Sequence, residues 1–441
     1  MKITFVGAGS TVFARNVIGD CILTPELGAF DVCLFDIDPK RLQESYDIIT
    51  NINKTANGKA TITQTLDRET AFRGADFVIN AIQVGLYEPC TVTDFEVPKK
   101  YGLRQTIADT LGIGGIFRGL RTIPVMKAYA DDMERWCPNA LFINYTNPMS
   151  ILSGYMQRYT NVKTIGLCHS VQSCVPHLLD ELGMSEYKDN NRWEIAGINH
   201  QAWLLKVEDL QGNDLYPEIK RRAFDPQYNT EMQDLVRLEM MRQFGYYITE
   251  SSEHCSEYTP WFIKDKYPEL IERYKIPLDE YPRRCVNQIA KWNEMRDKLL
   301  DETATIEHKK THEFASYIIK AMLTGEPYRV HGNVLNTGLI TNLPSNACVE
   351  VPVMIDRNGL NPCYVGDLPE QCAAVNRTNI NVQLLTIKAA ETLKKEYIYM
   401  AAMLDPHTSS ELSIDDIRAL CDDLIEAHGE LGKGGWLPKF N

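Results

Sequence analysis

The chain has 441 residues, a formal net charge of −13 at pH 7, 44% hydrophobic residues and 24% charged residues. This composition is that of a globular protein, and the length is enough for two or three domains. The acidic balance, without a cluster of lysines or arginines, argues against nucleic acid and anionic lipid surfaces as partners. No apolar run reaches the roughly 18 residues of a membrane-spanning helix, so none is predicted.

The twelve cysteines follow none of the familiar metal or disulfide spacings. No two form a Cys-x-x-Cys pair, and several, such as Cys33, lie in apolar, strand-like runs. Zinc fingers, iron–sulfur loops and a disulfide scaffold are therefore poor interpretations. Residues 1–7 lack the apolar core and cleavage site of a secretory signal, and we interpret them as the first strand. We expect a cytoplasmic protein with reduced thiols.

Up to about residue 190, short apolar runs alternate with helical patterns. The strand-like runs are 3–6, 32–36, 61–65, 77–82, 141–145 and 164–168, with helical patterns such as 39–53 and 120–135 between them. Strands rich in Val, Ile and Phe that are separated by helices predict a parallel sheet with helices on both faces. We expect an α/β fold class, with a doubly wound, Rossmann-like sheet in an N-terminal domain of residues 1–190.

From residue 191 the pattern changes. A mixed region leads to long helical patterns, which are clearest at 282–323 and 379–403. Ser413 is typical of a helix cap, and the helix that it opens is expected to end near Gly429. We predict a second domain over residues 191–441, with α+β structure that is largely helical. No Gly/Ser linker separates the two parts, so we expect them to share an interface.

A glycine turn follows the first predicted strand. Glycines at this point let the backbone approach a pyrophosphate at a helix N-terminus. Val12 stands at the third fingerprint position, so an ordinary strand–helix turn is the alternative. Asp36, at the end of the second strand, can accept hydrogen bonds from ribose hydroxyls and would repel a 2′-phosphate, which favours NAD over NADP. The residues of the turn that we assign to the cofactor are Gly7, Gly9, Ser10 and Thr11.

Polar groups follow several of the predicted strands. They are Asp36, Gln83, Asn147 and the pair Cys168-His169. Each alone could be a turn residue, but ligands of open parallel sheets bind beyond the carboxyl ends of the strands. This common placement predicts a site at that edge, where we assign Gln83 to the cofactor.

Three further segments carry possible chemistry. Cys168-His169 and Asn199-His200 offer a thiolate and imidazoles, which bind transition metals, although core packing is the alternative. The polar segment 249–254 could be a solvated loop. The glycine-rich segment 109–121 contains two arginines and indicates either close approach to an anionic or polyhydroxyl ligand, or a flexible connection into a helix near Leu120.

Together these segments resemble glycoside hydrolase family 4, the NAD- and metal-dependent glycosidases. The resemblance runs nearly end to end, through residues 5–10, 107–115, 144–149, 166–172, 196–200 and 249–254 in this order. The forms Cys-His-Ser-Val-Gln and Thr-Glu-Ser-Ser-Glu-His are most similar to the α-galactosidase (melibiase) branch. The resemblance implies a fold like that of lactate and malate dehydrogenases, with a second domain that binds the sugar.

The resemblance also implies a mechanism without net redox change. NAD⁺ takes a hydride from C3 of the sugar, and the resulting ketone acidifies the proton on C2. A base removes that proton while the metal, expected to be Mn²⁺, stabilises the enediolate. The aglycone then leaves with help from an acid, water adds, and NADH returns the hydride.

Roles can be carried over to matching positions. Cys168 and His200 match the metal ligands, and Asn147 matches a residue that contacts sugar hydroxyls. His169 follows the metal cysteine, where another branch has an aspartate as the acid, and an imidazole can act as this acid near neutral pH. From the glycine-rich segment we assign Asp109 and Arg118 to the substrate.

The base at C2 stays open at this point. Some branches use a tyrosine and others an aspartate, and the residues available here are Tyr246, Tyr247, Glu250 and His254. We favour Tyr247 or Glu250. No basic pocket for a phosphate can be identified, so an unphosphorylated sugar is preferred.

The leading hypothesis is an NAD- and Mn²⁺-dependent α-galactosidase, and a homo-oligomer (dimer or tetramer) is expected from the resemblance. Alternatives within the family are an α-glucosidase, or an α-glucuronidase or α-galacturonidase that would use Arg118 or Arg121 to face the sugar carboxylate. A different class is an NAD-dependent hydroxy-acid or polyol dehydrogenase, which would release NADH. A catalytically silent NAD sensor is disfavoured by the Cys168, His169, Asn147 and His200 set.

Overall fold

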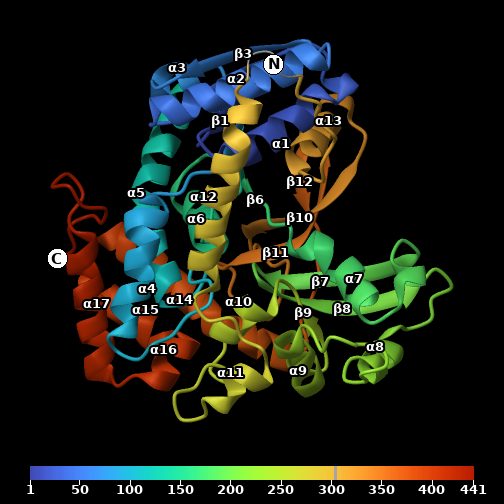
Figure 1. Cartoon of the computed structure of the whole chain (residues 1–441), viewed down its shortest axis with the longest axis vertical. Coiled ribbons are helices and arrows are strands. Elements are labelled where there is room, and N and C mark those ends of the chain that lie inside the picture. The colour runs from blue at the N-terminus through green and yellow to red at the C-terminus, as the bar shows by residue number, and fades with distance from the viewer. Residues whose placement is uncertain (302–304) are drawn as a thin grey trace.

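The computed structural model describes residues 1–301 and 305–441, and a twelve-stranded sheet runs through the molecule (Figure 1). Its first six strands pair in parallel in the order β3-β2-β1-β4-β5-β6. This is the order of doubly wound dinucleotide folds, so the predicted α/β class is confirmed. The strands are β1 (Lys2–Val6), β2 (Phe30–Phe35), β3 (Ala60–Thr65), β4 (Phe77–Asn80), β5 (Leu141–Asn144) and β6 (Lys163–Gly166).

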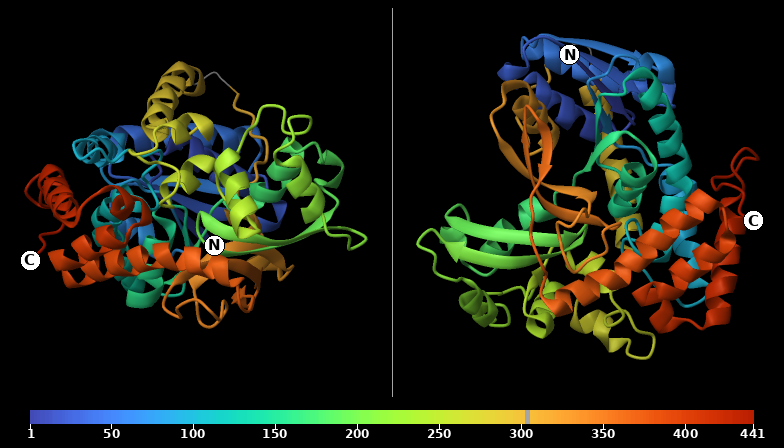
Figure 2. Two further views of the ribbon diagram at one scale, coloured as in Figure 1. Left: turned by 90° about the horizontal axis from the view of Figure 1, so that it is seen from below. Right: turned by 180° about the vertical axis from the view of Figure 1, so that it is seen from behind.

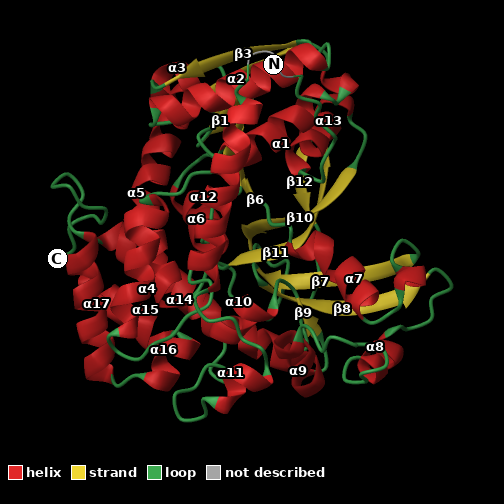
Figure 3. Cartoon of the chain, viewed as in Figure 1, coloured by secondary structure: helices red, strands yellow, loops and turns green. Residues whose placement is uncertain are grey.

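Helices cover both faces of this parallel sheet (Figure 3). Successive side chains of a strand point to opposite faces, so Ile79 and Val78 of β4 enter different hydrophobic clusters. The first cluster includes residues of α1 and α2, and the second includes residues of α3, α5 and α6. The helices are α1 (Thr11–Ile22), α2 (Pro39–Thr55), α3 (Arg68–Phe72), α4 (Val92–Lys99), α5 (Gly112–Trp136), α6 (Met149–Tyr159) and α7 (Ser170–Glu181), with short turns η1 (Pro25–Leu27), η2 (Leu86–Thr91) and η3 (Ser185–Tyr187).

The second part of the chain extends the same sheet with antiparallel strands. β10 pairs with β6 at Asn333 and Gly166, β11 pairs with β10, and β7 pairs with β11. The hairpin β7–β8 reaches out to one side of the molecule (Figure 2). These strands are β7 (Asn191–Ile198), β8 (Gln201–Asp209), β9 (Tyr247–Ile248), β10 (Tyr328–Leu335), β11 (Cys348–Asp356) and β12 (Gly359–Pro362).

The helices of the second part make it a mixed α+β region, as expected. They are α8 (Tyr216–Arg222), α9 (Leu235–Phe244), α10 (Ser252–Glu257), α11 (Glu269–Arg273), α12 (Glu280–Leu299), α13 (Phe314–Thr324), α14 (Glu370–Thr392), α15 (Lys395–Leu404), α16 (Pro406–Glu411) and α17 (Ile414–His428). α14 and α15 pack on α5, and α17 packs on α4, so the end of the chain returns to the first part. The predicted division at residues 190 and 191 falls at the start of β7 and stays a prediction.

A buried ion pair joins these distant segments. Arg121 of α5 donates two hydrogen bonds to the carboxylate of Asp94 in α4, and the Nε2 atom of His428 in α17 lies 2.8 Å from Oδ1 of Asp94. The three side chains are almost completely buried. The shared carboxylate therefore ties the C-terminal helix to the parallel part of the fold.

Three predicted helices differ from those observed. The helix predicted from Leu120 begins at Gly112, so most of the glycine-rich segment 109–121 belongs to α5 and is not a flexible connection. A Cβ on Gly114 would lie 2.4 Å from the carbonyl oxygen of Ala108, which shows how closely the preceding loop packs on this helix. The predicted helix 282–323 is divided between α12 and α13, and its residues 302–304 lie outside the described residues. The predicted helix 379–403 is interrupted at Leu393, which has a φ of 55°.

The last predicted helix and the cysteines agree with expectation. The Ser413 hydroxyl accepts a hydrogen bond from Asp416 N at 3.1 Å, and α17 ends before Gly429. All twelve cysteines are free thiols, and Cys168 and Cys363 are the two that are partly exposed. Among the helices described, none combines the length and the apolar character that crossing a membrane requires.

Candidate active site

The carboxyl ends of the parallel strands bring the predicted polar residues to one edge of the sheet. Gly7 follows β1, Asp36 follows β2, and Asn147 and Cys168 lie just beyond β5 and β6. Gln83 follows β4, where its Nε2 atom donates to the Thr91 hydroxyl at 3.3 Å. Parallel strands end at the same edge, so the common placement is a consequence of the strand order.

The glycine turn after β1 is closely packed against Asp36. Gly7 has a φ of +85°, and a Cβ there would lie 2.6 Å from the Ala81 carbonyl oxygen. Gly9 donates its N–H to Oδ2 of Asp36 at 2.6 Å, and a Cβ on Gly9 would lie 2.8 Å from the same oxygen. The turn therefore requires glycine at both positions.

The next two residues begin α1 and leave its N-terminus open. Ser10 is the N-cap residue, but its hydroxyl donates to the Gly7 carbonyl and makes no cap hydrogen bond. The Thr11 hydroxyl lies 3.4 Å from the Gly9 carbonyl oxygen. Free N–H groups at a helix start favour an anion. The turn, Asp36 and this helix start form a cradle that could hold a dinucleotide.

A cluster of possible metal ligands lies beyond β6. The Nε2 atom of His200 is 3.2 Å from Sγ of Cys168 and 3.4 Å from Oε2 of Glu250. His200 and Glu250 both have left-handed backbone conformations, with φ values of 61° and 72°. Such backbone strain in residues other than glycine is concentrated at functional sites. We call Cys168, His200 and Glu250 the thiolate cluster.

His200 also belongs to a second group of possible ligands. Asp109, His200 and His254 can each offer one ligand atom within 4.8 Å of the others, as the thiolate cluster can. His254 lies near a carboxylate of each group. Its Nε2 atom is 3.8 Å from Oδ1 of Asp109, and its Nδ1 atom is 3.5 Å from Oε1 of Glu250. The two groups therefore form one continuous site around His200.

The charges around His200 favour a cation. Burial would lower the pKa of His200, but Cys168 and Glu250 raise it to about 10. Burial would raise the pKa of Glu250, but His200 and His254 hold it below its ordinary value. The same thiol, imidazole and carboxylate donors could hold a divalent transition metal.

Asp109 is held in place by its own neighbours. Burial would raise its pKa, but the Arg118 guanidinium and the nearby histidines hold it below the ordinary value. Asn147 donates from Nδ2 to Oδ2 of Asp109 at 3.2 Å. The Oδ1 atom of Asn147 is buried without a hydrogen-bond partner among the described residues. A buried amide oxygen without a partner is expected to meet a ligand or water hydroxyl.

The loop that carries Asp109 is fixed by a carboxylate from α10. Glu257 accepts hydrogen bonds from the backbone N–H groups of Thr106 and Ala108 at 2.8 Å each, and from that of Ile107 at 3.2 Å. Burial raises the pKa of Glu257 to about 7, although these N–H groups lower it. His254 lies on the same short helix as Glu257. The hydrogen bonds from the loop to Glu257 therefore fix the position of Asp109 relative to His254.

His169 lies beside the thiolate cluster, directly after Cys168. It is the N-cap residue of α7, and its Nε2 atom is 2.9 Å from Oε2 of Glu313. Its side chain is 47% exposed, so a substrate can reach it.

The structure separates the two favoured candidates for the base. Glu250 lies in the thiolate cluster, whereas the Tyr247 hydroxyl is bound to the Asp234 carboxylate. Burial raises the pKa of Tyr247 well above its ordinary value. Tyr247 therefore keeps its proton and is engaged elsewhere.

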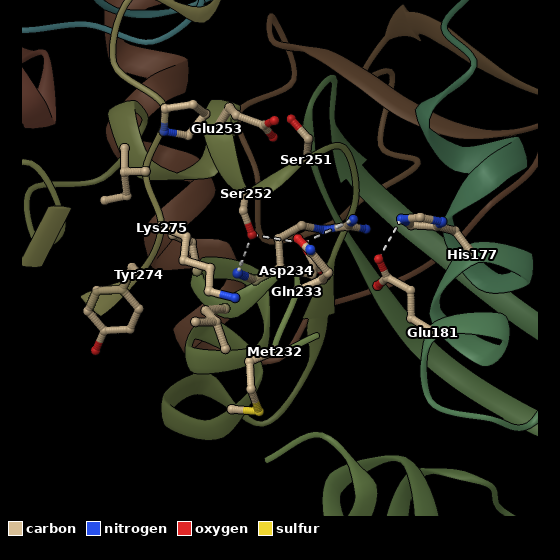
Figure 4. A pocket seen from close by; sticks show the side chains of 15 residues that line it. His177, Glu181, Met232, Gln233, Asp234, Ser251, Ser252, Glu253, Tyr274 and Lys275 are labelled. Atoms are coloured by element: carbon tan, nitrogen blue, oxygen red, sulfur yellow. Dashed lines mark hydrogen bonds and ion pairs between the residues drawn. The ribbon is translucent and has the colours of Figure 1, made fainter. Parts of the chain in front are cut away.

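A polar cavity of about 240 Å³ adjoins the site (Figure 4). Asp234 and Ser252 on its wall are joined by a hydrogen bond of 2.8 Å. Ser251, also on this wall, has its hydroxyl 2.9 Å from Nδ1 of His254. Ser251 thus connects the wall of the cavity to His254.

Sequence reasoning did not assign three residues of this site. His254 was considered only as a base, and its place beside Asp109 and His200 comes from the fold. Glu257 and Glu313 carried no signal in the sequence. Each acts through a contact with a residue more than 140 positions away.

Comparison with known proteins gives a family and a close relative. Residues 2–184 match the protein family described as "Family 4 glycosyl hydrolase". Residues 195–408 match the family described as "Family 4 glycosyl hydrolase C-terminal domain". The chain is 60% identical over 439 residues to an α-galactosidase of Bacillus subtilis, and the alignment covers 100% of this chain and 99% of that protein.

Solved structures share the fold. A Bacillus subtilis protein described as the glucosidase LplD superposes with a TM-score of 0.84, at 26% identity, over 96% of this chain and 99% of that one. A 6-phospho-β-glucosidase of Thermotoga maritima, solved with manganese, NAD⁺ and glucose-6-phosphate, has a TM-score of 0.78 at 19% identity, over 99% and 100% of the two chains. Malate dehydrogenase of Plasmodium falciparum, solved with NADH, has a TM-score of 0.51 at 16% identity, over 89% and 99%. The expected likeness to malate dehydrogenase is confirmed.

Proposed function

This chain is a glycoside hydrolase that belongs to family 4, and on that premise we propose that it hydrolyses α-galactosides with NAD and Mn²⁺. The observation that carries the proposal is the thiolate cluster beside an open dinucleotide cradle. Some dehydrogenases also hold a catalytic metal with cysteine and histidine, so the two family matches, over residues 2–184 and 195–408, are what favour a glycosidase over a dehydrogenase. The 60% identity to an α-galactosidase supports the choice of sugar.

The cradle fits NAD. Gly7 and Gly9 give the backbone room to approach a pyrophosphate, and Ser10 and Thr11 begin the helix whose N–H groups would face it. Asp36 would accept the ribose hydroxyls, and Gln83 lies at the same edge after β4. When bound, NAD supplies the oxidation of C3 and the later return of the hydride.

The donor set fits Mn²⁺. Cys168 and His200 would hold the ion, and Asp109 and His254 form a second group of possible ligands with the same His200. When bound, the metal supplies Lewis-acid stabilisation of negative charge on the sugar oxygens. A thiolate among the ligands makes the site sensitive to oxidation.

Glu250 is the base that the geometry favours for the C2 proton. Its pKa is held below the ordinary value by His200 and His254 against the effect of burial, so it is ionised and can accept a proton. Tyr247 is fully buried and hydrogen-bonded to Asp234. We propose that Tyr247 supports the site and that Glu250 acts at C2.

The surrounding charges favour an uncharged sugar. Arg237 is paired with Asp234, and Arg284 is paired with Glu253. Arg118 contacts the Asn147 carbonyl and the Tyr281 hydroxyl, and it lies in the field of Asp109. A uronic acid or a phosphorylated sugar would have to compete with these partners. Asn147, Asp109 and Arg118 are proposed to bind the sugar hydroxyls.

The experiment that tests the function is hydrolysis of aryl glycosides with NAD⁺, Mn²⁺ and a thiol reductant, each omitted in turn. Release from an α-galactoside that needs all three, without accumulation of NADH, is the expected result. If an α-glucuronide, α-galacturonide or α-glucoside reacts faster than the α-galactoside, the enzyme belongs to another branch of the family, with that sugar as its substrate. Steady NADH formation with hydroxy acids or polyols, and no glycoside cleavage, would make the protein a dehydrogenase.

The setting of the enzyme is part of the same proposal. Twelve free thiols agree with the reducing cytoplasm. A dimer or tetramer follows from the resemblance alone and stays a prediction.

A further inference from the structure

The ring of His169 is held by a carboxylate and two aromatic rings, and these contacts have no part in the function proposed above. Its Nε2 atom is 2.9 Å from Oε2 of Glu313. The ring stacks on Phe314, with centroids 5.2 Å apart, and on Tyr145, with centroids 6.3 Å apart. Among the residues that the structure describes, Nδ1 makes no hydrogen bond. One nitrogen is therefore fixed by the protein, and the other is left available.

Glu313 is itself anchored in the fold. The residue is 8% exposed, and its N–H donates to the Thr311 hydroxyl at 3.3 Å. Thr311 is bound through its N–H and its hydroxyl to Asp20, which is completely buried in α1. The next residue but one, Ala315, donates its N–H to the Tyr145 hydroxyl at 3.1 Å. The segment that presents Glu313 is thus fixed on both sides.

We propose that Glu313 is the positioning residue for His169, an inference that rests on the proposed function and on the acid role that the family resemblance implies for His169. The carboxylate accepts the Nε2–H hydrogen bond and so fixes one orientation of the ring. Nδ1 then faces the leaving group. A carboxylate in this relation to a catalytic imidazole orients it without taking its proton.

The step that this geometry serves is the departure of the aglycone. In the imidazolium form of His169 both ring nitrogens carry a proton. The Nδ1–H proton passes to the glycosidic oxygen while the bond from C1 to that oxygen breaks, and the ring is left as the neutral Nε2–H tautomer. The electron pair of the broken bond stays on the oxygen, and the pair left at C2 by the base forms the C1=C2 double bond. Glu313 remains a carboxylate throughout.

Leaving groups differ in their need for this proton. A sugar alkoxide is a poor leaving group and requires protonation, whereas 4-nitrophenolate leaves without it. Loss of a correctly held acid therefore impairs a disaccharide and spares an aryl galactoside. Loss of the fold, of NAD or of the metal impairs both substrates alike.

The experiment compares kcat/KM of the NAD- and Mn²⁺-loaded protein for an α-galactosyl-glucose disaccharide and for 4-nitrophenyl α-galactoside. In Glu313→Ala we expect the value for the disaccharide to fall by about 10²-fold, with the loss in kcat, and the value for the aryl galactoside to stay nearly unchanged. Glu313→Gln, whose carbonyl can still accept from Nε2–H, should retain more activity on the disaccharide. His169→Ala should show the same selectivity, and the double variant should lose no more than His169→Ala.

A matched control is Glu181→Gln. Glu181 forms the other histidine–glutamate contact of α7, with Oε1 3.0 Å from Nε2 of His177 (Figure 4). Its removal should leave both substrates unaffected.

Equal losses on both substrates, or no loss in Glu313→Ala, would overturn the inference while leaving the proposed function intact. If Glu313→Ala does not fold, the isosteric Glu313→Gln decides by the same ratio. A wild-type protein that cleaves neither substrate would remove the proposed function, and the inference with it.

Discussion

His200 is the residue on which the candidate site depends. Its Nε2 atom faces the Cys168 thiol and the Glu250 carboxylate, and it belongs to both groups of possible ligands. Its left-handed backbone, with a φ of 61°, turns the chain between β7 and β8 so that the imidazole reaches this point. One strained residue therefore joins the antiparallel hairpin to the edge of the parallel sheet.

Cys168→Ser is expected to abolish Mn²⁺-dependent turnover while NAD affinity and thermal stability stay nearly unchanged. A serine hydroxyl is protonated at neutral pH and is a much weaker ligand than a thiolate. Titration of activity and of NAD binding with Mn²⁺ measures the two effects separately. Cys363→Ser is the control, since Cys363 is also partly exposed but lies outside the cluster. Loss of folding in Cys168→Ser would mean that this cysteine is structural.

Asp36→Ala is expected to weaken NAD binding about 10- to 100-fold, with little change in metal affinity. The carboxylate would provide charge-assisted hydrogen bonds to the ribose, and it also fixes the Gly9 N–H of the turn. Calorimetric titration with NAD⁺ measures the loss.

The control for this prediction is Asp38→Ala, two residues away. Asp38 caps α2 by accepting from the N–H groups of Lys40 and Arg41, so its loss should cost about 1 kcal/mol of stability and no NAD affinity. Unchanged NAD affinity in Asp36→Ala would remove the ribose assignment.

At the scale of elements, α10 and the loop 106–109 are positioned by one another. The Glu257 carboxylate of α10 accepts hydrogen bonds from three consecutive backbone N–H groups of the loop. Within this loop, Ala108 has a left-handed φ of 52°. The glycines of α5 let that loop lie directly against the helix. The distance between Asp109 and His254 is therefore set by backbone packing.

Glu257→Gln is expected to lower stability by about 1–3 kcal/mol and to weaken Mn²⁺ binding. The amide NH₂ group cannot accept hydrogen bonds, so at least one buried N–H loses its partner. Thermal unfolding and a Mn²⁺ titration measure the two effects.

Glu253→Gln is the control on the same helix. Its side chain forms a partly exposed ion pair with Arg284, whose loss should cost less than about 1 kcal/mol. If Glu257→Gln matches Glu253→Gln in both measurements, the loop is held by other contacts.

At the scale of the whole molecule, the sheet passes from the parallel into the antiparallel part through a polar interior. Glu350 of β11 is completely buried, and its Oε1 atom accepts from Asn333 Nδ2 of β10 at 3.1 Å. Burial raises the pKa of Glu350 to about 7, from an ordinary value of 4.5. A carboxyl group at the centre of the sheet therefore remains protonated in the folded state under mildly acidic conditions.

The pH dependence of stability follows from this shift. Between pH 4.5 and about 7, the unfolded chain has released the proton of Glu350 while the folded chain keeps it. The contribution to the free energy of unfolding is therefore full below pH 4.5, falls by about 1.4 kcal/mol for each pH unit in this window, and levels off above it. Glu350→Gln should equal the wild type near pH 5 and exceed it in stability at pH 8.

Denaturant unfolding of both proteins across this pH range checks the prediction. Glu326→Gln, at an exposed ion pair with Lys320, is the control and should show a constant difference from the wild type. A constant difference for Glu350→Gln would show that its carboxyl group is not shifted.

The first half of the fold could be predicted because its signals are local. Strands rich in Val, Ile and Phe alternate with helices, and parallel strands buried on both faces leave little choice of architecture. The same logic placed Asp36, Asn147 and Cys168 at one edge. The helical pattern 379–403 was predicted as one helix, whereas the structure divides it between α14 and α15, because the left-handed turn at Leu393 has no glycine or proline to indicate it.

The sequence by itself determined the parallel sheet and the glycine turn with Asp36, since each depends on a short stretch of chain. The metal and acid positions are predictions that rest on the family resemblance. Only the tertiary structure decided which side chains meet. It placed Glu250 beside His200, and it joined the Tyr247 hydroxyl to the Asp234 carboxylate by a hydrogen bond. It also brought Glu313 to His169. Hydrogen-bond partners so distant in sequence leave no periodic or local pattern, because only packing of the sheet and its helices brings them together.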